Sequence, residues 1–240
     1  HIKPIFSGSI GLLGLVMLII MILAPQVGAF ETDLTVNGLK QAQTSLVRTK
    51  TMADKEEASR YNIAEGVSII GDSVTLRATP GLQEVLPDAQ TDAQVSRNTK
   101  QASAIMLYNS QNKALPKVVV VATGVNNPED YKADLDFLIS NLPKGHQLVL
   151  VTPYEGDTSQ ATQPYVEKYA SYAREVAQQY PYVEIADWNQ VSKDNPDIWK
   201  GTDQVHFGKD NTKLEEGAKL YAETIASAIK ALEDKPVKSK

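Results

Sequence analysis

The chain has 240 residues, of which 42% are hydrophobic and 22% charged, so it can form one good-sized globular domain plus additional segments and is not collagenous, coiled-coil or disordered. Its formal net charge of −5 argues against a nucleic-acid-binding surface, which needs clustered lysine and arginine. The absence of cysteine excludes a disulfide framework, a cysteine metal site and a thiol nucleophile.

The first segment, residues 1–30, contains a long apolar run without charge from Ile5 to Phe30. A helix needs ~20 apolar residues to cross ~30 Å of hydrocarbon, so this run predicts a transmembrane helix. A cleaved signal peptide and a buried soluble helix are the alternatives. Lys3 before the run and Glu31 and Asp33 after it place its N-terminal side in the cytoplasm, so that the following domain lies outside the cell.

Residues 31–61 are polar and lack a strand pattern, which predicts a helical stalk or a loose tether. The remaining chain divides into a domain at residues 62–233 and a short tail at residues 234–240. Because the chain begins with His1 and not with Met, we expect it to be a piece of a longer protein or a processed product.

The domain contains short apolar runs of strand length in which valine and isoleucine dominate. They are Val67–Ile70, Lys117–Ala122, Gln147–Val151 and Val183–Ala186. The less apolar segment Asp88–Val95 is a further, weaker strand candidate. Such runs are typical of strands buried on both faces, as in a parallel sheet. Residues with helical spacing lie between them, in the segments 128–142, 165–176 and 214–229. The alternation predicts a doubly wound α/β sheet.

In such a sheet, ligands bind at the carboxyl ends of the strands. The segments that follow the predicted strands there are Gly71–Ser73, Gly124–Asn126, Thr152–Tyr154 and Asp187–Trp188. Asn127 precedes Pro128 and is expected to cap the next helix, which leaves Asn126 available to the site. We expect Asp72 to tie the adjacent loop by hydrogen bonds.

A serine nucleophile at Ser73 needs a histidine base, and the chain has three histidines. His1 precedes the apolar run, and His146 stands at the start of a strand, the wrong end for a site. His206 lies in the loop before the last helix, and Asp203 precedes it by three residues. In a tight turn that spacing lets the carboxylate face the imidazole Nδ1–H. With scattered histidines and no cysteine, we expect no metal and no cofactor.

Three motifs carry a family resemblance. GDSV at Gly71–Val74, GVN at Gly124–Asn126 and DQVH at Asp203–His206 resemble the first, third and fifth sequence blocks of SGNH hydrolases, in the same order and with similar separations. Each motif alone is weak, but the three together are specific. The resemblance covers residues 67–232 and implies a three-layer, doubly wound parallel sheet of the SGNH or flavodoxin-like type.

The resemblance also implies the roles of the site residues. Ser73 is the nucleophile and its backbone N–H an oxyanion donor, His206 is the general base and acid, Asp203 orients His206, and the Asn126 side chain donates to the oxyanion. The family has a glycine donor in its second block, where the best aligned residue here is Ser96. If that position requires a positive φ, serine is disfavoured relative to glycine.

Several residues near the strand ends are candidates for substrate contact. Tyr154 and Glu155 follow a predicted strand and are expected to line the pocket. Trp188 is a further candidate, although both Trp188 and Trp199 have the alternative of a place in the core.

The order of apolar run, tether and SGNH-like domain, together with the segments VTPYE and ADW, resembles the C-terminal part of peptidoglycan O-acetyltransferases of Gram-positive bacteria. That resemblance implies a membrane enzyme with an extracellular domain and an upstream multi-span domain that delivers acetyl. It further implies acetyl transfer through an acyl-serine to the primary hydroxyl of N-acetylmuramic acid, a modification linked to lysozyme resistance. A membrane-anchored carbohydrate or lipid esterase is the main alternative. A non-catalytic wall-binding module is a weaker one, because the triad residues are all present.

Overall fold

The computed structural model describes residue 61 and residues 63–239. Its elements, in chain order, are β1 (Val67–Gly71), α3 (Ser73–Arg77), α4 (Thr79–Val85), β2 (Gln90–Ala93), α5 (Thr99–Gln111), β3 (Val118–Ala122), η1 (Pro128–Asp130), α6 (Tyr131–Asn141), β4 (Gln147–Val151), α7 (Gln163–Ala177), β5 (Val183–Ala186), α8 (Trp188–Asp194), η2 (Pro196–Trp199) and α9 (Asn211–Ala231). The transmembrane helix predicted within residues 1–30 lies outside the described residues, as does nearly all of the predicted tether. None of the helices described at residues 63–239 has the length and apolar content to cross a bilayer.

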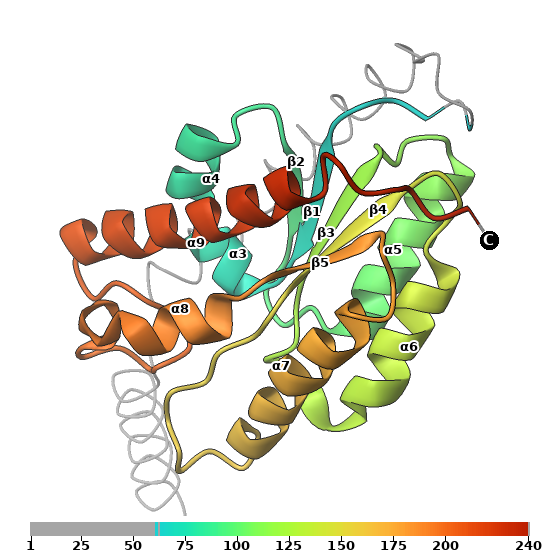
Figure 1. Cartoon of the computed structure of the whole chain (residues 1–240). Helices are drawn as coiled ribbons and strands as arrows, with labels where there is room; N and C mark the ends of the chain where they lie inside the picture. Colours follow the sequence, from blue (N-terminus) through green and yellow to red (C-terminus); the bar gives the residue numbers. More distant parts are fainter. Residues whose placement is uncertain (1–60, 62, 240) are drawn as a thin grey trace, which may run out of the picture.

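The five strands form one parallel sheet in the order β2-β1-β3-β4-β5 (Figure 1). All five predicted strands are therefore confirmed, including the weaker one, which becomes the edge strand β2. Every residue of β3 and β4 is buried, as their continuous apolar sequences predict. After β2 the chain crosses over β1 to β3, so the winding direction reverses between β1 and β3. Ligand sites in open α/β sheets lie at such a reversal.

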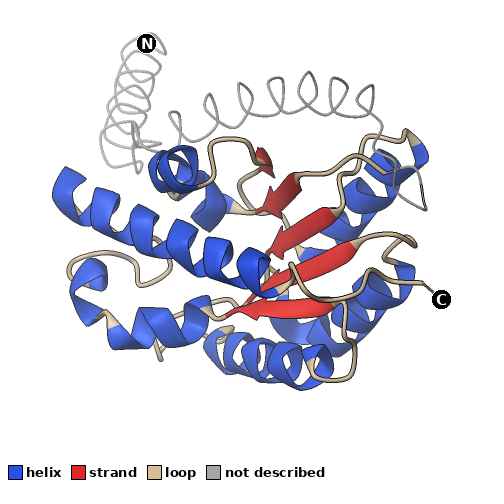
Figure 2. Cartoon of the chain, turned by 45° about the horizontal axis from the view of Figure 1, so that its top comes forward, coloured by secondary structure: helices blue, strands red, loops and turns tan. Residues whose placement is uncertain are grey.

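Alternate residues of each strand contact opposite helical layers, because successive side chains of a strand point to opposite faces. In β3, Val118 and Val120 pack with residues of α4 and α9. Val119 and Val121 pack with residues of α5, α6 and α7. Figures 1 and 2 show the two helical layers on either side of the sheet. The predicted three-layer, doubly wound architecture is confirmed.

Helix α5 was not among the predicted elements, although its start signal is present in the sequence. The Asn98 side chain accepts a hydrogen bond from the Gln101 backbone N–H, and the Gln101 side chain accepts one from the Asn98 N–H. This reciprocal pair is a capping box, which identifies a helix N-terminus. The helix orders the chain directly after Arg97, next to the site described below.

Two local predictions differ from the structure. Asn127 occupies the cap position before η1, but its φ of 53° is left-handed and its side chain makes no capping bond, because an N-cap residue needs an extended backbone. The packed part of the chain also extends past residue 233. The Lys238 carbonyl accepts a hydrogen bond from the Gly145 N–H at 2.8 Å, and the Lys238 N–H donates to the His146 carbonyl at 2.9 Å. The predicted tail is therefore paired with the segment before β4.

Candidate active site

Ser73 is the first residue of α3, directly after the carboxyl end of β1. Its neighbour Asp72 is the N-cap, whose Oδ1 accepts a hydrogen bond from the Val74 N–H at 2.9 Å. Asp72 therefore ties this turn as predicted, and Ser73 is left free of a capping role. The preceding Gly71 is required by space, since a Cβ there would lie 2.1 Å from Thr75 Oγ1.

The structure brings Ser73, His206 and Asp203 into direct contact. His206 Nε2 lies 2.7 Å from Ser73 Oγ, and His206 Nδ1 lies 2.7 Å from Asp203 Oδ2. An ionised carboxylate only accepts hydrogen bonds, so Nδ1 carries the proton and Nε2 accepts from the Ser73 hydroxyl. This is the arrangement in which a histidine can withdraw a serine proton while a carboxylate holds the ring tautomer.

The Asp203 carboxylate is held in its ionised form by hydrogen bonds from its own turn. Its Oδ1 accepts from the Val205 N–H at 3.0 Å and from the His206 N–H at 2.7 Å. Burial by itself would raise the pKa of Asp203, but the hydrogen bonds from the His206 ring and from the two backbone N–H groups outweigh it and lower the pKa to about 2. Asp203 is therefore an anion throughout the neutral range.

Asn126 and Ser96 stand together beside the carboxyl ends of β1 and β3. The Arg97 N–H donates to the Gln94 carbonyl at 3.3 Å, and Ser96 is the third residue of this turn, with a φ of 60°. The position does adopt the left-handed conformation that favours glycine, and serine occupies it. The Asn126 side-chain amide donates to the Arg97 carbonyl at 3.2 Å, so the second and third blocks are in contact.

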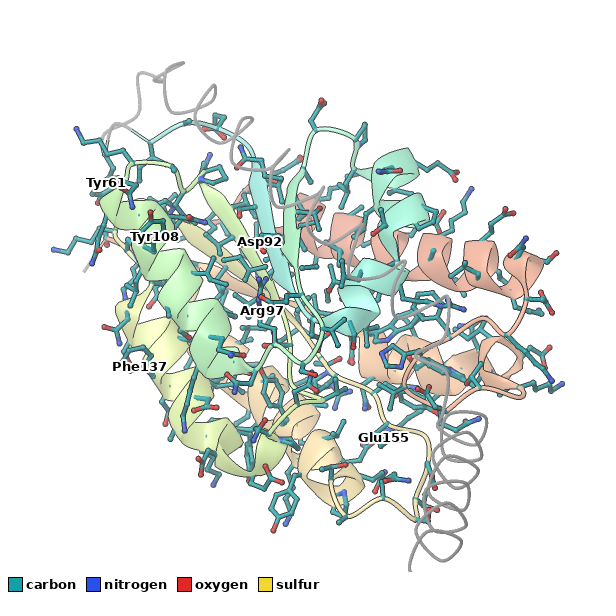
Figure 3. The ribbon with its side chains drawn as sticks, turned by 180° about the vertical axis from the view of Figure 1, so that it is seen from behind. Tyr61, Asp92, Arg97, Tyr108, Phe137 and Glu155 are labelled. Atoms are coloured by element: carbon teal, nitrogen blue, oxygen red, sulfur yellow. The ribbon has the colours of Figure 1, made fainter. Side chains whose placement is uncertain are left out.

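Sequence reasoning missed Arg97, which is buried in this corner of the site. Its Nη1 donates to the Gly71 carbonyl at 3.1 Å, and its Nη2 forms an ion pair with Asp92 Oδ1 at 2.7 Å. Figure 3 shows Asp92 and Arg97 near one another beside β1. The signal in the sequence was an arginine adjacent to the second-block residue, with an aspartate five positions before it.

The three residues predicted to contact substrate lie in different environments. Tyr154 is half-buried and packs on Trp199, with ring centroids 4.6 Å apart. Glu155 lies on the loop after β4 (Figure 3), and burial, followed by the nearby carboxylates, raises its pKa. Trp188 takes the alternative place in the core. Its ring is 2% exposed and packs edge-on against Tyr221 at 5.0 Å, because the aromatic residues of α8 and α9 fill the same core layer.

His146, excluded above as a base, is buried at the opposite end of the sheet, where its Nδ1 lies 2.9 Å from the Pro116 carbonyl oxygen. Within the described part of the chain, no group of three or more histidine, aspartate or glutamate side chains is placed to hold a metal ion.

The buried Asp72 carboxyl generates a prediction about stability and pH. Burial raises the Asp72 pKa from its ordinary value of 3.8 to about 6, against the opposing hydrogen bond from Val74. The folded state thus holds a proton that the unfolded state releases, and stability falls as the pH rises from about 4 to about 6. Two pH units at about 1.4 kcal/mol each give an effect on the order of 3 kcal/mol.

Asp72→Asn keeps the oxygen that accepts from Val74 but removes this titration. Denaturant unfolding at pH 4 and pH 7 should show the variant gaining about 3 kcal/mol relative to wild type between the two pH values. A difference between the two proteins that stays constant with pH would show that Asp72 does not hold the proton.

Comparison with known proteins places the chain among characterised structures. It is 62% identical to the structure of the Streptococcus pneumoniae peptidoglycan O-acetyltransferase A C-terminal catalytic domain with a methylsulfonyl adduct, over 74% of this chain and 99% of that one, with a TM-score of 0.73. An α/β hydrolase from the Lake Arreo metagenome (17% identity, 72% and 98% coverage, TM-score 0.54) and an acylhydrolase from Bacteroides fragilis (15%, 77% and 95%, 0.55) share the fold alone. No protein-family model and no curated protein matches. The chain belongs to the family of peptidoglycan O-acetyltransferase catalytic domains of the SGNH type.

Proposed function

We propose that this domain is an O-acetyltransferase that moves an acetyl group through an acyl-serine on Ser73 to the primary hydroxyl of N-acetylmuramic acid in peptidoglycan. One observation supports this most strongly. The hydrogen-bonded chain Ser73–His206–Asp203, with two contacts of 2.7 Å, occurs in a domain that is 62% identical to a peptidoglycan O-acetyltransferase catalytic domain.

In the first half-reaction, His206 Nε2 takes the Ser73 hydroxyl proton as Oγ attacks the carbonyl carbon of the acetyl donor. The tetrahedral intermediate collapses, the donor's oxygen leaves with the proton from His206, and acetyl remains as an ester on Ser73. In the second half-reaction, His206 takes the proton of the acceptor hydroxyl, which attacks the acyl-serine. Ser73 then leaves and recovers its proton from His206. Asp203 stabilises the imidazolium that forms in each half-reaction.

The oxyanion of both intermediates lies between the second- and third-block residues. An asparagine amide has two N–H donors; in Asn126 one of them donates to Arg97, and the other faces the oxyanion. The Ser96 backbone N–H has no hydrogen-bond partner among residues 61 and 63–239, and it supplies a further donor together with the Ser73 N–H. Each such donor is worth about 3 kcal/mol of barrier height.

The acceptor separates this proposal from the anchored-esterase alternative, because both use the same acyl-serine. Tyr154 and Glu155, beside the triad, are the proposed contacts for the glycan.

Residues 5–30 would anchor the enzyme in the cell membrane with the domain at 62–233 outside the cell. A flexible tether of about 30 residues would average roughly 30 Å end to end and would hold the domain near the membrane and newly made glycan. Acetyl would be delivered by an upstream multi-span domain, and the acetylated glycan would resist lysozyme.

Ser73→Ala should leave the fold intact and abolish turnover of an activated acetyl ester, because loss of a triad nucleophile costs several orders of magnitude. Ser227→Ala is the matched control, since Ser227 is an exposed serine on α9 that bonds only within its own helix. If Ser73→Ala retains turnover within about 10-fold of wild type, Ser73 is not the nucleophile.

Asn126→Ala should lower kcat by about 10²–10³-fold with little change in KM, because the lost N–H acts on the transition state. Asn127→Gly is the control. It removes the adjacent, exposed amide at a left-handed position that glycine tolerates, and should remain close to wild type. If Asn126→Ala raises KM and leaves kcat unchanged, Asn126 binds substrate instead.

The glycan should be a better acceptor than water, since a bound and oriented hydroxyl has an effective molarity of up to ~10⁵ M or more. The measurement supplies an acetyl-ester donor with and without muramyl oligomers, and compares O-acetylated glycan by mass spectrometry with free acetate. Free acetate as the sole product at saturating glycan would replace the transferase by the anchored esterase.

A further inference from the structure

Helix α3 carries a functional group at each end. Ser73 is its first residue and Arg77 its last. The Arg77 side chain reaches the loop that carries the base: Nε donates to the Phe207 carbonyl at 2.9 Å, and Nη2 donates to the Gly208 carbonyl. These two carbonyls directly follow His206. We propose that Arg77 is a positioning residue, which fixes His206 relative to Ser73 through this two-pronged contact. The proposal rests on the roles proposed above for Ser73 and His206.

The loop needs such a contact because it has no regular structure. Residues 200–210 form neither helix nor strand. The hydrogen bonds of Asp203 close a turn within the loop and do not place it relative to α3. Backbone bonds tie the loop to other segments: the Thr202 and Gly208 N–H groups donate to η2 at 3.1 and 2.8 Å, and the Gln204 carbonyl accepts from the loop after β4 at 3.0 Å. The Arg77 contact joins the loop to the helix of the nucleophile.

The chemistry of the guanidinium suits this contact. Its N–H groups are held in a planar fork, so two of them can address successive carbonyls without further loss of side-chain freedom. Burial lowers the pKa of Arg77 and the Asp203 carboxylate opposes that effect, yet an arginine stays charged in proteins. Both bonds are therefore charge-assisted. A lysine at this position would keep the charge but lack the fork.

The geometry at the triad explains why such positioning matters. Proton transfer between Ser73 and His206 depends on the 2.7 Å contact between Oγ and Nε2. A displacement of about 1 Å in an active site can cost about 10²-fold in rate. Because α3 is a single short helix, its backbone transmits the position of Arg77 to Ser73. Removing the guanidinium should therefore impair the chemical step rather than substrate binding.

The test is Arg77→Ala, assayed by turnover of an activated acetyl ester in water, which does not depend on glycan. We expect kcat to fall about 10²-fold with KM little changed. Guanidinium chloride at tens of millimolar is far below denaturing concentrations. It should occupy the vacated site and raise the kcat of Arg77→Ala about 10-fold. The melting temperature, measured with and without the added ion, separates this recovery from a general change in stability.

Two control variants accompany it. Asp203→Ala disrupts the same loop without vacating a guanidinium site, so guanidinium should not restore its activity. Lys219→Ala removes an exposed cation of α9 that pairs with Glu84 of α4, and it should retain wild-type kcat. Arg77→Lys keeps the charge and the aliphatic stem, and serves if Arg77→Ala fails to fold. It should fold and still lose about 10-fold in kcat.

Three results would overturn the proposal: a kcat for Arg77→Ala close to wild type, a loss that guanidinium does not restore, or full activity in Arg77→Lys. None of them would affect the proposed nucleophile, which fails separately if Ser73→Ala keeps ester turnover. Conversely, glycan that accepts no acetyl would remove the transferase function and leave the role of Arg77 in Ser73 acylation intact.

Discussion

The hydrogen bond between the His206 ring and the Ser73 hydroxyl joins residues 133 positions apart, and the geometry of the site depends on that 2.7 Å contact. The parallel sheet provides the frame for it. Because all strands end at the same edge, the turn after β1 and the loop before α9 meet at the point where the winding direction reverses. Asp72 caps the helix that begins at Ser73, and Asp203 holds the His206 ring by a hydrogen bond. The contacts of Arg77 join these two segments.

The two aspartates of the site show how the surroundings separate chemically identical groups. Asp72 is enclosed in the protein, and burial raises its pKa to about 6. Asp203 also loses water contact, but its carboxylate receives hydrogen bonds from the His206 ring and from two backbone N–H groups, and its pKa falls to about 2. Donated hydrogen bonds favour the ionised form, whereas desolvation disfavours it. Asp203 can therefore stabilise an imidazolium, while Asp72 serves the turn that presents Ser73.

The α/β hydrolase and the acylhydrolase that share this fold are only 15–17% identical to the chain. Their similarity therefore carries no information about the acceptor of an acyl group. The sheet and the strand ends provide a place for a nucleophile, a base and oxyanion donors. In the proposed function, the loop after β4 that carries Tyr154 and Glu155 contacts the glycan. Under that proposal, transferase and esterase differ in these loops and in the position of the domain relative to its substrate.

Local patterns in the sequence were sufficient for all five strands, for the helices α6, α7 and α9, and for the pairing of Asp203 with His206. The meeting of His206 with Ser73, 133 positions away, was expected only from the resemblance of three separate motifs to one family. Valine-rich runs, helical spacing and a three-residue separation depend on neighbours in the chain, so they can be read without coordinates. Other features depended on packing between distant segments. Trp188 lies in the core because Tyr221 from α9 contacts it, and the left-handed Ser96 and the buried Arg97 are set by the turn between β2 and α5. The hydrogen bonds from Arg77 to the Phe207 and Gly208 carbonyls join residues separated by about half of the chain. Only the tertiary structure decides such a contact, because no local pattern specifies which distant carbonyls a side chain will meet.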